Sequence, residues 1–456
     1  MTTQFKIPAK EDTLLKYRDE FVIPTFRQMN ASAVPTEIAD QPVTYLCGNS
    51  LGLLAKRSKK LVEEELEVWA SKAVEAHFDH PYGRGWMWIA DTVHPYLAKL
   101  VGASESEVAC MGTLTANLHL MLNVFYKPTA GRYKILCEAR AFPSDQYAMA
   151  TQVAARGMNP DEVIIQLKPR KGEHTLRTED IIDTIKREGS SIALVLFAGL
   201  QFYTGQLFQI PEITAAAKAE GCVCGWDLAH AVGNVPLSLH DWDVDFAVWC
   251  SYKYLNSGPG GIAGLYVHDR HADLPVQEAG WWGHDPATRF DMPPTFKAIR
   301  GAQGFQQSNP SVLSIVSLLG SLQVFDAAGG MQAIRARSLR LTGYLEALLK
   351  QSKFYAPPEA FFRDGAELKF TIITPANPAE RGAQLSLAFL PLGRGVMPKV
   401  LKQLEARGVV GDSRKPDVIR IAPAALYNTF EDVERAVKVL DEAMEAVAKE
   451  GLPAKA

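Results

Sequence analysis

The chain has 456 residues, 47% of them hydrophobic and 22% charged, and this length predicts one large domain with at least one smaller domain beside it. A formal net charge of −3 at pH 7, with no basic stripe along the sequence, argues against nucleic acid as a partner. The sequence starts without an apolar signal segment, and its longest apolar run, at 192–200, is shorter than a membrane span of about 20 residues, so we expect a cytoplasmic protein that does not bind membranes.

The first 50 residues are expected to form a polar N-terminal arm, with helical character at 11–21, that joins the smaller domain. At its end, YLCGNSLGLL (45–54) contains a G-x-S-x-G motif between a short apolar run (43–47) and a helical pattern (53–70). A strand, a turn and a helix in this order form the nucleophile elbow of serine hydrolases, which makes Ser50 a candidate nucleophile. However, only 49 residues precede Ser50, too few for the strands that come before such an elbow, and no HGGG-type oxyanion loop occurs upstream.

An alternation of strands and helices begins near residue 132. Nearly continuous apolar strands are expected at 133–138, 162–168, 192–199 and 222–228, and amphipathic helices between them at 144–157, 179–189 and 210–221. This pattern is typical of a parallel sheet with helices on both faces. The sequence therefore predicts an α/β fold, with a large domain over 51–330.

The remainder of the chain predicts further strands at 245–255 and 261–268 and a long helix from residue 311. Helices at 339–352 and 430–450 then mix with strands at 368–374 and 384–390. This mixture is typical of a smaller α+β domain, which we place at 331–456.

Several motifs are better explained as ordinary structure. The six cysteines contain no C-x-x-C pair and lie mostly in apolar runs, which predicts reduced, buried thiols, and the CVC run at 222–224 is expected to be strand core and not a metal site. GPGGIA (258–263) matches a loose dinucleotide-binding pattern, but a strand follows it where a helix is needed. No P-loop and no H-E-x-x-H motif occur, and we expect no bound metal.

Two stretches carry chemistry at the carboxyl ends of predicted strands, where ligands of parallel sheets gather. Asp227 ends one strand and His230 follows it, and Lys253 stands in an apolar and aromatic run. Taken singly, Asp227 could be a helix cap beside a solvated histidine, and Lys253 could extend its amine to solvent. Together they fit an enzyme that uses pyridoxal 5′-phosphate, which needs a lysine for a Schiff base and an acid to keep the ring nitrogen protonated.

Seven segments in order resemble the kynureninases: YLCGNSLG, FPSD, FYTGQLF, DLAHAVGN, CSYKYLNSGPGGIAG, GWWGH and SNPS, from about Tyr45 to about Phe430. The resemblance implies an aspartate-aminotransferase-type fold (fold type I) and a homodimer with its active sites at the subunit interface. It also implies pyridoxal phosphate on Lys253 and hydrolysis of L-kynurenine, and of 3-hydroxykynurenine, to the anthranilate and L-alanine. Preference between the two substrates, and a catabolic or an NAD-directed biosynthetic role, stay open.

By the same resemblance, each site residue has an implied role. Lys253, Tyr252 and Asp227 are the implied catalytic residues, and Tyr252 is the implied acid–base partner. The implied cofactor residues are Leu114, Thr115, Phe142, Pro143, Ser144, Asp145, Asp227, His230, Tyr252 and Lys253, with Trp281 and Asn309 from the dimer partner. The implied substrate residues are Asn49, Ser50, His284, Arg420 and either His77 or His80, so that Ser50 would contact substrate and not act as a nucleophile.

One position departs from the family, and three rivals remain to be compared. Ala198 stands where the family usually has a hydroxyl residue, so a cofactor hydrogen bond is expected to be lost or replaced by water. A cysteine desulfurase needs a mobile cysteine, commonly in the C-terminal half, and this chain has none after Cys250. An aminotransferase would also use Arg420, but GWWGH favours an aryl substrate. A binding protein on the same fold would be expected to lack Lys253 or Asp227.

Overall fold

A computed structural model describes residues 12–363, 365 and 367–451. The first eleven residues of the predicted N-terminal arm lie outside the described residues, as do the last five residues of the predicted small domain. The predicted helical character at 11–21 takes the form of a short 3-10 helix, Leu15–Glu20.

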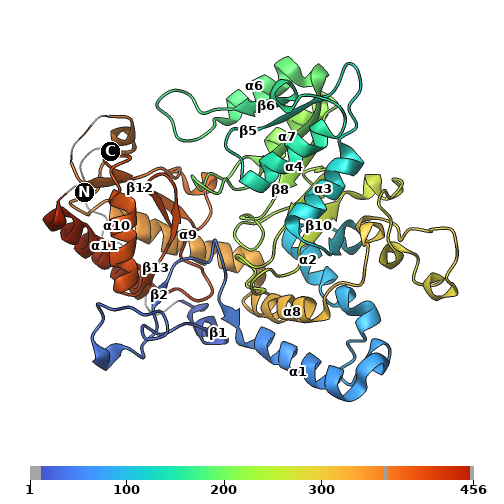
Figure 1. Cartoon of the computed structure of the whole chain (residues 1–456), viewed down its shortest axis with the longest axis horizontal. Helices are drawn as coiled ribbons and strands as arrows, with labels where there is room; N and C mark the ends of the chain where they lie inside the picture. The colour runs from blue at the N-terminus through green and yellow to red at the C-terminus, as the bar shows by residue number, and fades with distance from the viewer. Residues whose placement is uncertain (1–11, 364, 366, 452–456) are drawn as a thin grey trace.

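A seven-stranded sheet forms the centre of the larger part of the molecule (Figure 1). Its order is β4 (Val108–Cys110), β10 (Gly264–Val267), β9 (Phe246–Trp249), β8 (Val223–Asp227), β7 (Ile192–Ala198), β5 (Lys134–Glu138) and β6 (Ile164–Leu167). From β9 to β6 all neighbours are parallel, whereas β10 is antiparallel to both β9 and β4. The mostly parallel sheet expected from the sequence is confirmed.

Helices cover both faces of this sheet because its strands are apolar on both sides. Along β7, Leu194 and Leu196 join one buried cluster and Val195 and Phe197 join the other, as the two-residue period of a strand requires. The first face packs against α3 (Leu114–Phe125) and α4 (Pro143–Ala154). The second face packs against α2 (His94–Val101), α6 (Thr178–Glu188), α7 (Ile210–Ala219) and α8 (Val312–Ala327).

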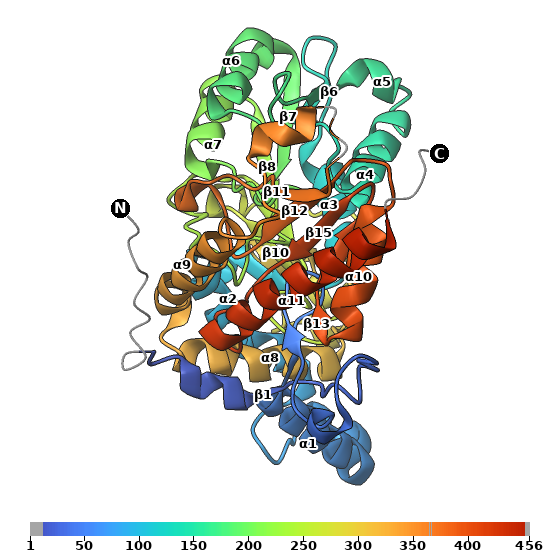
Figure 2. The same cartoon turned by 90° about the vertical axis from the view of Figure 1, so that its left-hand side faces the viewer.

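A second, antiparallel sheet lies beside the first and has its own core (Figure 2). Its order is β11 (Lys369–Ile372), β12 (Leu385–Leu390), β15 (Val418–Ile421) and β14 (Asp412–Arg414), and it packs with α9 (Gly330–Leu349), α10 (Val396–Ala406) and α11 (Phe430–Glu450). This arrangement is the α+β unit that the sequence predicts.

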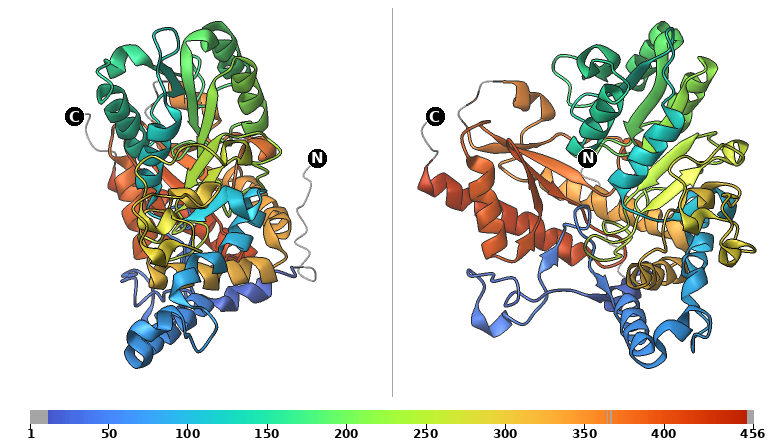
Figure 3. Two further views of the ribbon diagram at one scale, coloured as in Figure 1. Left: turned by 90° about the vertical axis from the view of Figure 1, so that its right-hand side faces the viewer. Right: turned by 45° about the vertical axis from the view of Figure 1, so that its right-hand side comes forward.

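The N-terminal segment runs along both units (Figure 3). β2 (Thr44–Tyr45) pairs in parallel with β13 (Val409–Val410) of the smaller unit, and β1 (Phe21–Val22) pairs with β3 (Leu54–Ala55). α1 (Lys56–Lys72) then packs along α8. Among the described residues no single helix has the length and apolar composition of a membrane span; α8 and α9 reach that composition only as a pair, bent by 76°.

One predicted strand is too long. We predicted a strand over 245–255, but β9 ends at Trp249 and the chain then turns. The turn is closed by backbone hydrogen bonds from Ser257 to Ser251 and from Asn256 to Lys253, and Asn256 adopts a left-handed φ of 53°. Lys253 therefore lies in a tight loop beyond the sheet, and not within a strand.

Candidate active site

A cavity of about 280 Å³ opens at the carboxyl ends of β7 and β8. It is lined by residues from the ends of these strands, from the first turns of α3 and α4, and from the loop after β9. They are Leu114, Thr115, Phe142, Ser144, Asp145, Ala198, Leu200, Phe202, Asp227, Ala229, His230, Tyr252 and Lys253. The structure thus brings together most of the residues that the sequence assigned to a cofactor.

The amine of Lys253 is held in this cavity by its neighbours. Its Nζ donates a hydrogen bond of 2.9 Å to Nε2 of His230 and lies 5.9 Å from the ring centroids of Phe142 and Tyr252. The loop that carries it is closed at the back by Gly52, whose N–H donates to the carbonyl of Tyr252. A Cβ at Gly52 would overlap the carbonyl oxygen of Lys253, so only glycine allows this approach.

This packing gives the G-x-S-x-G motif a structural role and removes the hydrolase alternative. The motif follows the two-residue strand β2, outside the seven-stranded sheet, and leads to the two-residue strand β3. Ser50 is half-buried there and is not among the residues that line the cavity. A nucleophile elbow would instead place the serine at the end of a strand of the main sheet.

Asp227 and His230 are buried and Lys253 is half-buried, so neither a solvated histidine nor a lysine that extends its amine to solvent describes this site. The Asp227 carboxylate accepts a 2.7 Å hydrogen bond from the N–H of Ala229, and burial raises its pKa. Burial, with a smaller contribution from the charge of Lys253, lowers the pKa of His230 well below its usual range. His230 is therefore a neutral acceptor for the lysine amine, and its Nδ1 has no partner within the described part of the chain.

One further carboxyl group lines this cavity, and another is buried close to it. Asp145, in the first turn of α4, lies beside Asp227, and burial followed by the charge of Asp227 raises its pKa well above the ordinary value. Glu138, the last residue of β5, is buried too, and burial raises its pKa to about 8. The sequence analysis overlooked Glu138, although it ends an apolar strand by the same rule that singled out Asp227.

The raised pKa of Glu138 predicts how the cofactor-free protein responds to pH. Because the folded-state pKa lies above the ordinary value of 4.5, protonated Glu138 stabilises the folded chain. This contribution is complete below about pH 4.5 and is lost as the pH rises to about 8. We therefore expect the denaturant midpoint of the cofactor-free protein to fall over this range, and to fall less steeply in Glu138→Gln.

The matched control is Glu212→Gln, which removes an exposed carboxyl on α7. It should retain the wild-type slope of midpoint against pH. Equal slopes in wild type and Glu138→Gln would contradict the assignment of a protonated Glu138.

The other end of the cavity suits an anion. Leu114 and Thr115 begin α3, where backbone N–H groups have no partner within the helix, and Thr113 caps the helix by accepting from Ala116. Pro143 fixes the start of α4, and Ser144 adds a hydroxyl. Burial raises the pKa of Tyr252, so its phenol stays protonated near neutral pH and can donate to an oxyanion.

The residues present fit pyridoxal 5′-phosphate. The cavity offers the amine of Lys253, the acid Asp227 and the N-terminus of α3 for a phosphate. Phe142, 42% exposed, offers an open aromatic face for a ring. His230 Nδ1 and one oxygen of Asp145 are buried without a partner in the described residues, as expected of groups that face a missing ligand. Ala198 contributes no side-chain hydrogen bond.

Two of the predicted substrate residues are buried close to this cavity. Asn49 donates to Gln384, and its Oδ1 has no partner in the described residues. Arg420, in β15, donates a 2.8 Å bond from Nη1 to the carbonyl of Phe202, which lines the cavity, and pairs through Nη2 with Asp412. Its Nε is free of hydrogen bonds among the described residues. Sequence reasoning missed Gln384 and Asp412, which lie in no motif, and Phe202, which begins the FYTGQLF segment but was given no role.

One chain alone does not bring the remaining predicted residues into the cavity. Trp281 is 46% exposed, and Asn309 lines a separate cavity beside α3. Both ring nitrogens of His284 are used, by Thr288 and by the N–H of Lys297. His80 is likewise occupied, by Glu65 and by the N–H of Tyr82, whereas His77 uses only Nδ1.

Comparison with known protein families places these residues in context. Residues 334–440 match the model of the kynureninase C-terminal domain. Kynureninase of Eremothecium gossypii is 50% identical over 98% of this chain and 99% of its own length. Kynureninases of Saccharomyces cerevisiae (52% identity, covering 94% of this chain and 96% of that protein) and Myxococcus xanthus (50% identity, covering 94% of each) are also similar.

Solved structures share the fold at low sequence identity. The cysteine desulfurase CsdA of Escherichia coli superposes with a TM-score of 0.72 at 15% identity, covering 95% of this chain and 99% of that one. A C-DES variant with glycine covalently linked to its PLP cofactor gives 0.71 at 16% identity, covering 88% and 96%. These neighbours confirm the predicted fold class.

Proposed function

Because the chain belongs to the kynureninase family, we infer that it hydrolyses L-kynurenine to anthranilate and L-alanine in the cavity that contains Lys253. The single observation that carries the placement of the reaction is the contact of Lys253 with His230 in a cavity that also holds Asp227. The enzyme uses pyridoxal 5′-phosphate, which supplies a ring that withdraws electrons from the bond to be broken.

We assign a role to each wall of the cavity. Lys253 would attach the cofactor, and Phe142 would pack on its ring. Asp227 would keep the ring nitrogen protonated, and Asp145 would share a proton with Asp227. Leu114, Thr115, Ser144 and Tyr252 would hold the phosphate at the N-terminus of α3. Pro143 fixes the backbone that carries Ser144. His230 orients the lysine amine.

Proton transfers then fall to two residues. The amine of Lys253 would remove the proton from the substrate carbon next to the carboxylate. Tyr252, whose raised pKa keeps it protonated, acts as the acid that donates to the substrate during hydrolysis of the ketone. Addition of water to the aryl ketone then allows the bond between Cβ and Cγ to break.

Substrate contacts follow from groups that are still free. The Nε of Arg420 is unpaired among the described residues. Together with one Nη it can donate two hydrogen bonds to the substrate carboxylate. Asn49 presents an unpaired oxygen, and Ser50 follows it. At the aryl end we propose His284 and either His77 or His80; both nitrogens of His284 and of His80 are bonded here, so each of these two would have to exchange one bond to contact substrate. Both kynurenine and 3-hydroxykynurenine are proposed substrates.

A homodimer would complete the site. Exposed aromatic side chains gather where 69–88 meets 281–290: Trp69, Phe78, Trp88, Trp281 and Phe290. Phe78 contacts Trp88 and Phe290, and Trp281 also contacts Phe290. An exposed aromatic cluster of this kind supports an interface with a second copy, which would deliver Trp281 and Asn309 to the neighbouring cavity.

Charge in this aromatic cluster should separate the subunits. Phe78→Asp is expected to shift the protein from dimer to monomer in sedimentation velocity at micromolar concentration and to reduce turnover at least about tenfold, since an aspartate buried in an apolar contact is costly. Leu339→Asp, on the exposed side of α9, is the control and should remain dimeric. A fully active monomer would refute the shared site.

The desulfurase neighbours share the fold but not the site chemistry. No cysteine lines the cavity within the described part of the chain, and the nearest in sequence to Lys253 is Cys250. Burial raises the pKa of Cys250, so it remains a thiol and not the nucleophilic thiolate that sulfur transfer needs.

All six cysteines are unpaired, which supports the proposed cytoplasmic location. The pairing of β2 with β13 supports a division into an arm at 1–50, a large domain at 51–330 and a small domain at 331–456.

The test uses the purified protein with added pyridoxal phosphate. L-Kynurenine and its 3-hydroxy derivative are supplied separately, and anthranilate, 3-hydroxyanthranilate and alanine are measured. Stoichiometric formation of the aryl product and alanine supports the proposal. A protein that carries the cofactor but forms neither product would refute it.

A further inference from the structure

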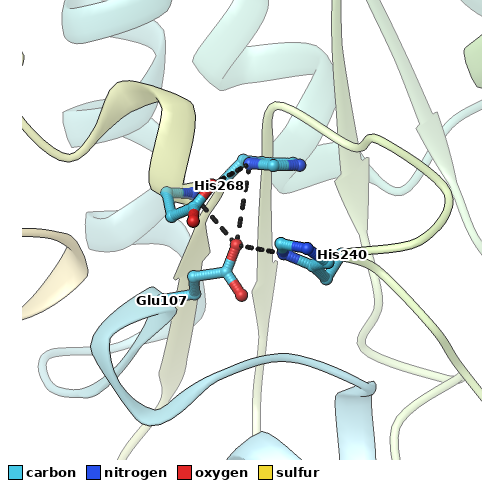
Figure 4. A group of neighbouring side chains, drawn as sticks. Glu107, His240 and His268 are labelled. Carbon is cyan, nitrogen blue, oxygen red and sulfur yellow. Dashed lines mark hydrogen bonds and ion pairs between the residues drawn. The ribbon is translucent and has the colours of Figure 1, made fainter.

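A compact group of imidazole and carboxylate side chains (Figure 4) lies outside the active-site cavity that contains Lys253. Glu107, immediately before β4, faces His240, in the loop that leads to β9, and His268, immediately after β10; Asp269 follows His268. One ligand atom of each residue lies within 4.8 Å of the others.

The sheet register places this group at the opposite ends of the strands from the active site. Val267, the residue before His268, pairs with Phe246 at the start of β9, whereas Lys253 follows the end of β9. Glu107 precedes Val108, which pairs with Tyr266 near the end of β10. The two sites therefore lie at opposite ends of the same strands, and the proposed reaction makes no use of this second group.

The spacing of the ligand atoms suits one small cation. Oε1 of Glu107 lies 2.9 Å from Nδ1 of His240 and 3.6 Å from Nδ1 of His268, and Nδ1 of His268 lies 3.0 Å from Oδ1 of Asp269. Four ligands at 2.0–2.1 Å around a tetrahedral zinc ion are about 3.3 Å apart, close to these three separations. The rings of His240 and His268 are stacked, with centroids 4.8 Å apart, so one ring has to rotate before both Nδ1 atoms point at the same ion.

The residues around the group already orient its ligands. Glu107 is fully buried, and it is held by the N–H groups of Ser104 and Asp269. Nε2 of His268 faces Asp243 at 3.4 Å, the arrangement that directs the lone pair of a ligating histidine to its other nitrogen. A cation would replace the 3.2 Å bond from the N–H of Arg270 to Nδ1 of His268 and the direct 2.9 Å bond between Nδ1 of His240 and Oε1 of Glu107.

We propose that Glu107, His240, His268 and Asp269 form a binding site for a divalent cation of the zinc class. Two imidazole nitrogens with two carboxylate oxygens favour Zn²⁺ or Co²⁺ over Mg²⁺ and Ca²⁺, which prefer oxygen alone. Binding forms bonds to the two carboxylates and the two Nδ1 atoms, and any proton on Nδ1 of His240 leaves to solvent. The site joins the loop at 240 to the antiparallel pair β4 and β10.

The experiment titrates tag-free holoenzyme, freed of metal by a chelator, with Zn²⁺ in a calorimeter and with Co²⁺ in a spectrophotometer. The wild type is expected to bind one ion per chain at this site, to give the visible absorption of tetrahedral Co²⁺, and to melt a few degrees higher with Zn²⁺. His240→Ala, at a half-exposed position, should weaken binding at least about tenfold and remove the absorption, and Asp269→Asn should weaken binding less.

The matched control is His271→Ala. His271 lies three residues beyond His268 but pairs with Asp245 and is not one of the four ligands. It should bind Zn²⁺ as the wild type does, and all these variants should retain turnover, since the site is remote from Lys253. Binding that is equal in wild type and His240→Ala, or the absence of tetrahedral Co²⁺ absorption in the wild type, would overturn the proposal; neither result bears on kynurenine hydrolysis.

Discussion

Replacement of Lys253 by alanine is expected to lower turnover of L-kynurenine by more than about 10⁴-fold, the largest effect of any single substitution in this protein. In the proposed reaction the lysine has two tasks, to attach the cofactor and to move the substrate proton, and no other described amine lines the cavity. Alanine removes both tasks without adding bulk to the loop. The measurement is anthranilate formation at saturating substrate and added cofactor.

The same variant gives a readout that is independent of turnover. Borohydride reduction of the wild-type holoenzyme should leave the cofactor mass on the peptide that contains Lys253, and Lys253→Ala should show no such adduct. Lys134→Ala is the control. Lys134 is the first residue of β5, at the amino end of the strand and away from the cavity, and it pairs with Glu188. Retention of a tenth or more of wild-type turnover in Lys253→Ala would sink the assignment of Lys253.

The parallel sheet could be predicted because its strands are apolar on both faces. In β7 the first six residues are buried, so the sequence shows one continuous apolar run between two helical patterns. The same rule pointed to Asp227, the first polar residue after such a run. Where a strand is buried on both faces, its apolar run therefore predicts both the position of the strand and the polar residue at its carboxyl end.

The pattern became unreliable where tertiary contacts decide the local structure. The run from Phe246 to Leu255 looks like one strand, yet hydrogen bonds from Asn256 and Ser257, together with the contact of Gly52 from a distant segment, turn the chain after Trp249. No local propensity encodes a partner 200 residues away.

Partners that lie outside any motif were invisible as well. Gln384, which pairs with Asn49, is 335 residues away from it in the chain. Asp412 lies only eight residues before Arg420, but the two meet because β14 and β15 pair, which no local pattern announces. The group around Glu107 was missed because 133 residues separate Glu107 from His240, so no metal-ligand spacing appears in the sequence. Glu138 differs, since its place at the end of β5 was a usable signal.

The second large effect is expected at Asp227. Asp227→Asn keeps the shape of the side chain and can keep the bond from the Ala229 N–H, but it removes the negative charge that, in the proposed site, would hold the proton on the ring nitrogen of the cofactor. We expect kcat for L-kynurenine to fall about 10²–10⁴-fold, while the cofactor stays attached to Lys253.

Asp227→Asn is expected to lose turnover and keep the cofactor attached, whereas Lys253→Ala is expected to lose both. Burial raises the pKa of Asp227 in the cofactor-free chain, so the carboxylate is costly there unless a cation lies beside it, and the protonated ring nitrogen supplies that cation. Asp227→Glu, which keeps the charge, is the matched control and should retain more activity than Asp227→Asn at equal thermal stability. If Asp227→Asn turns over kynurenine at the wild-type rate, the ring nitrogen is not protonated through Asp227, and Asp145 becomes the residue to replace next.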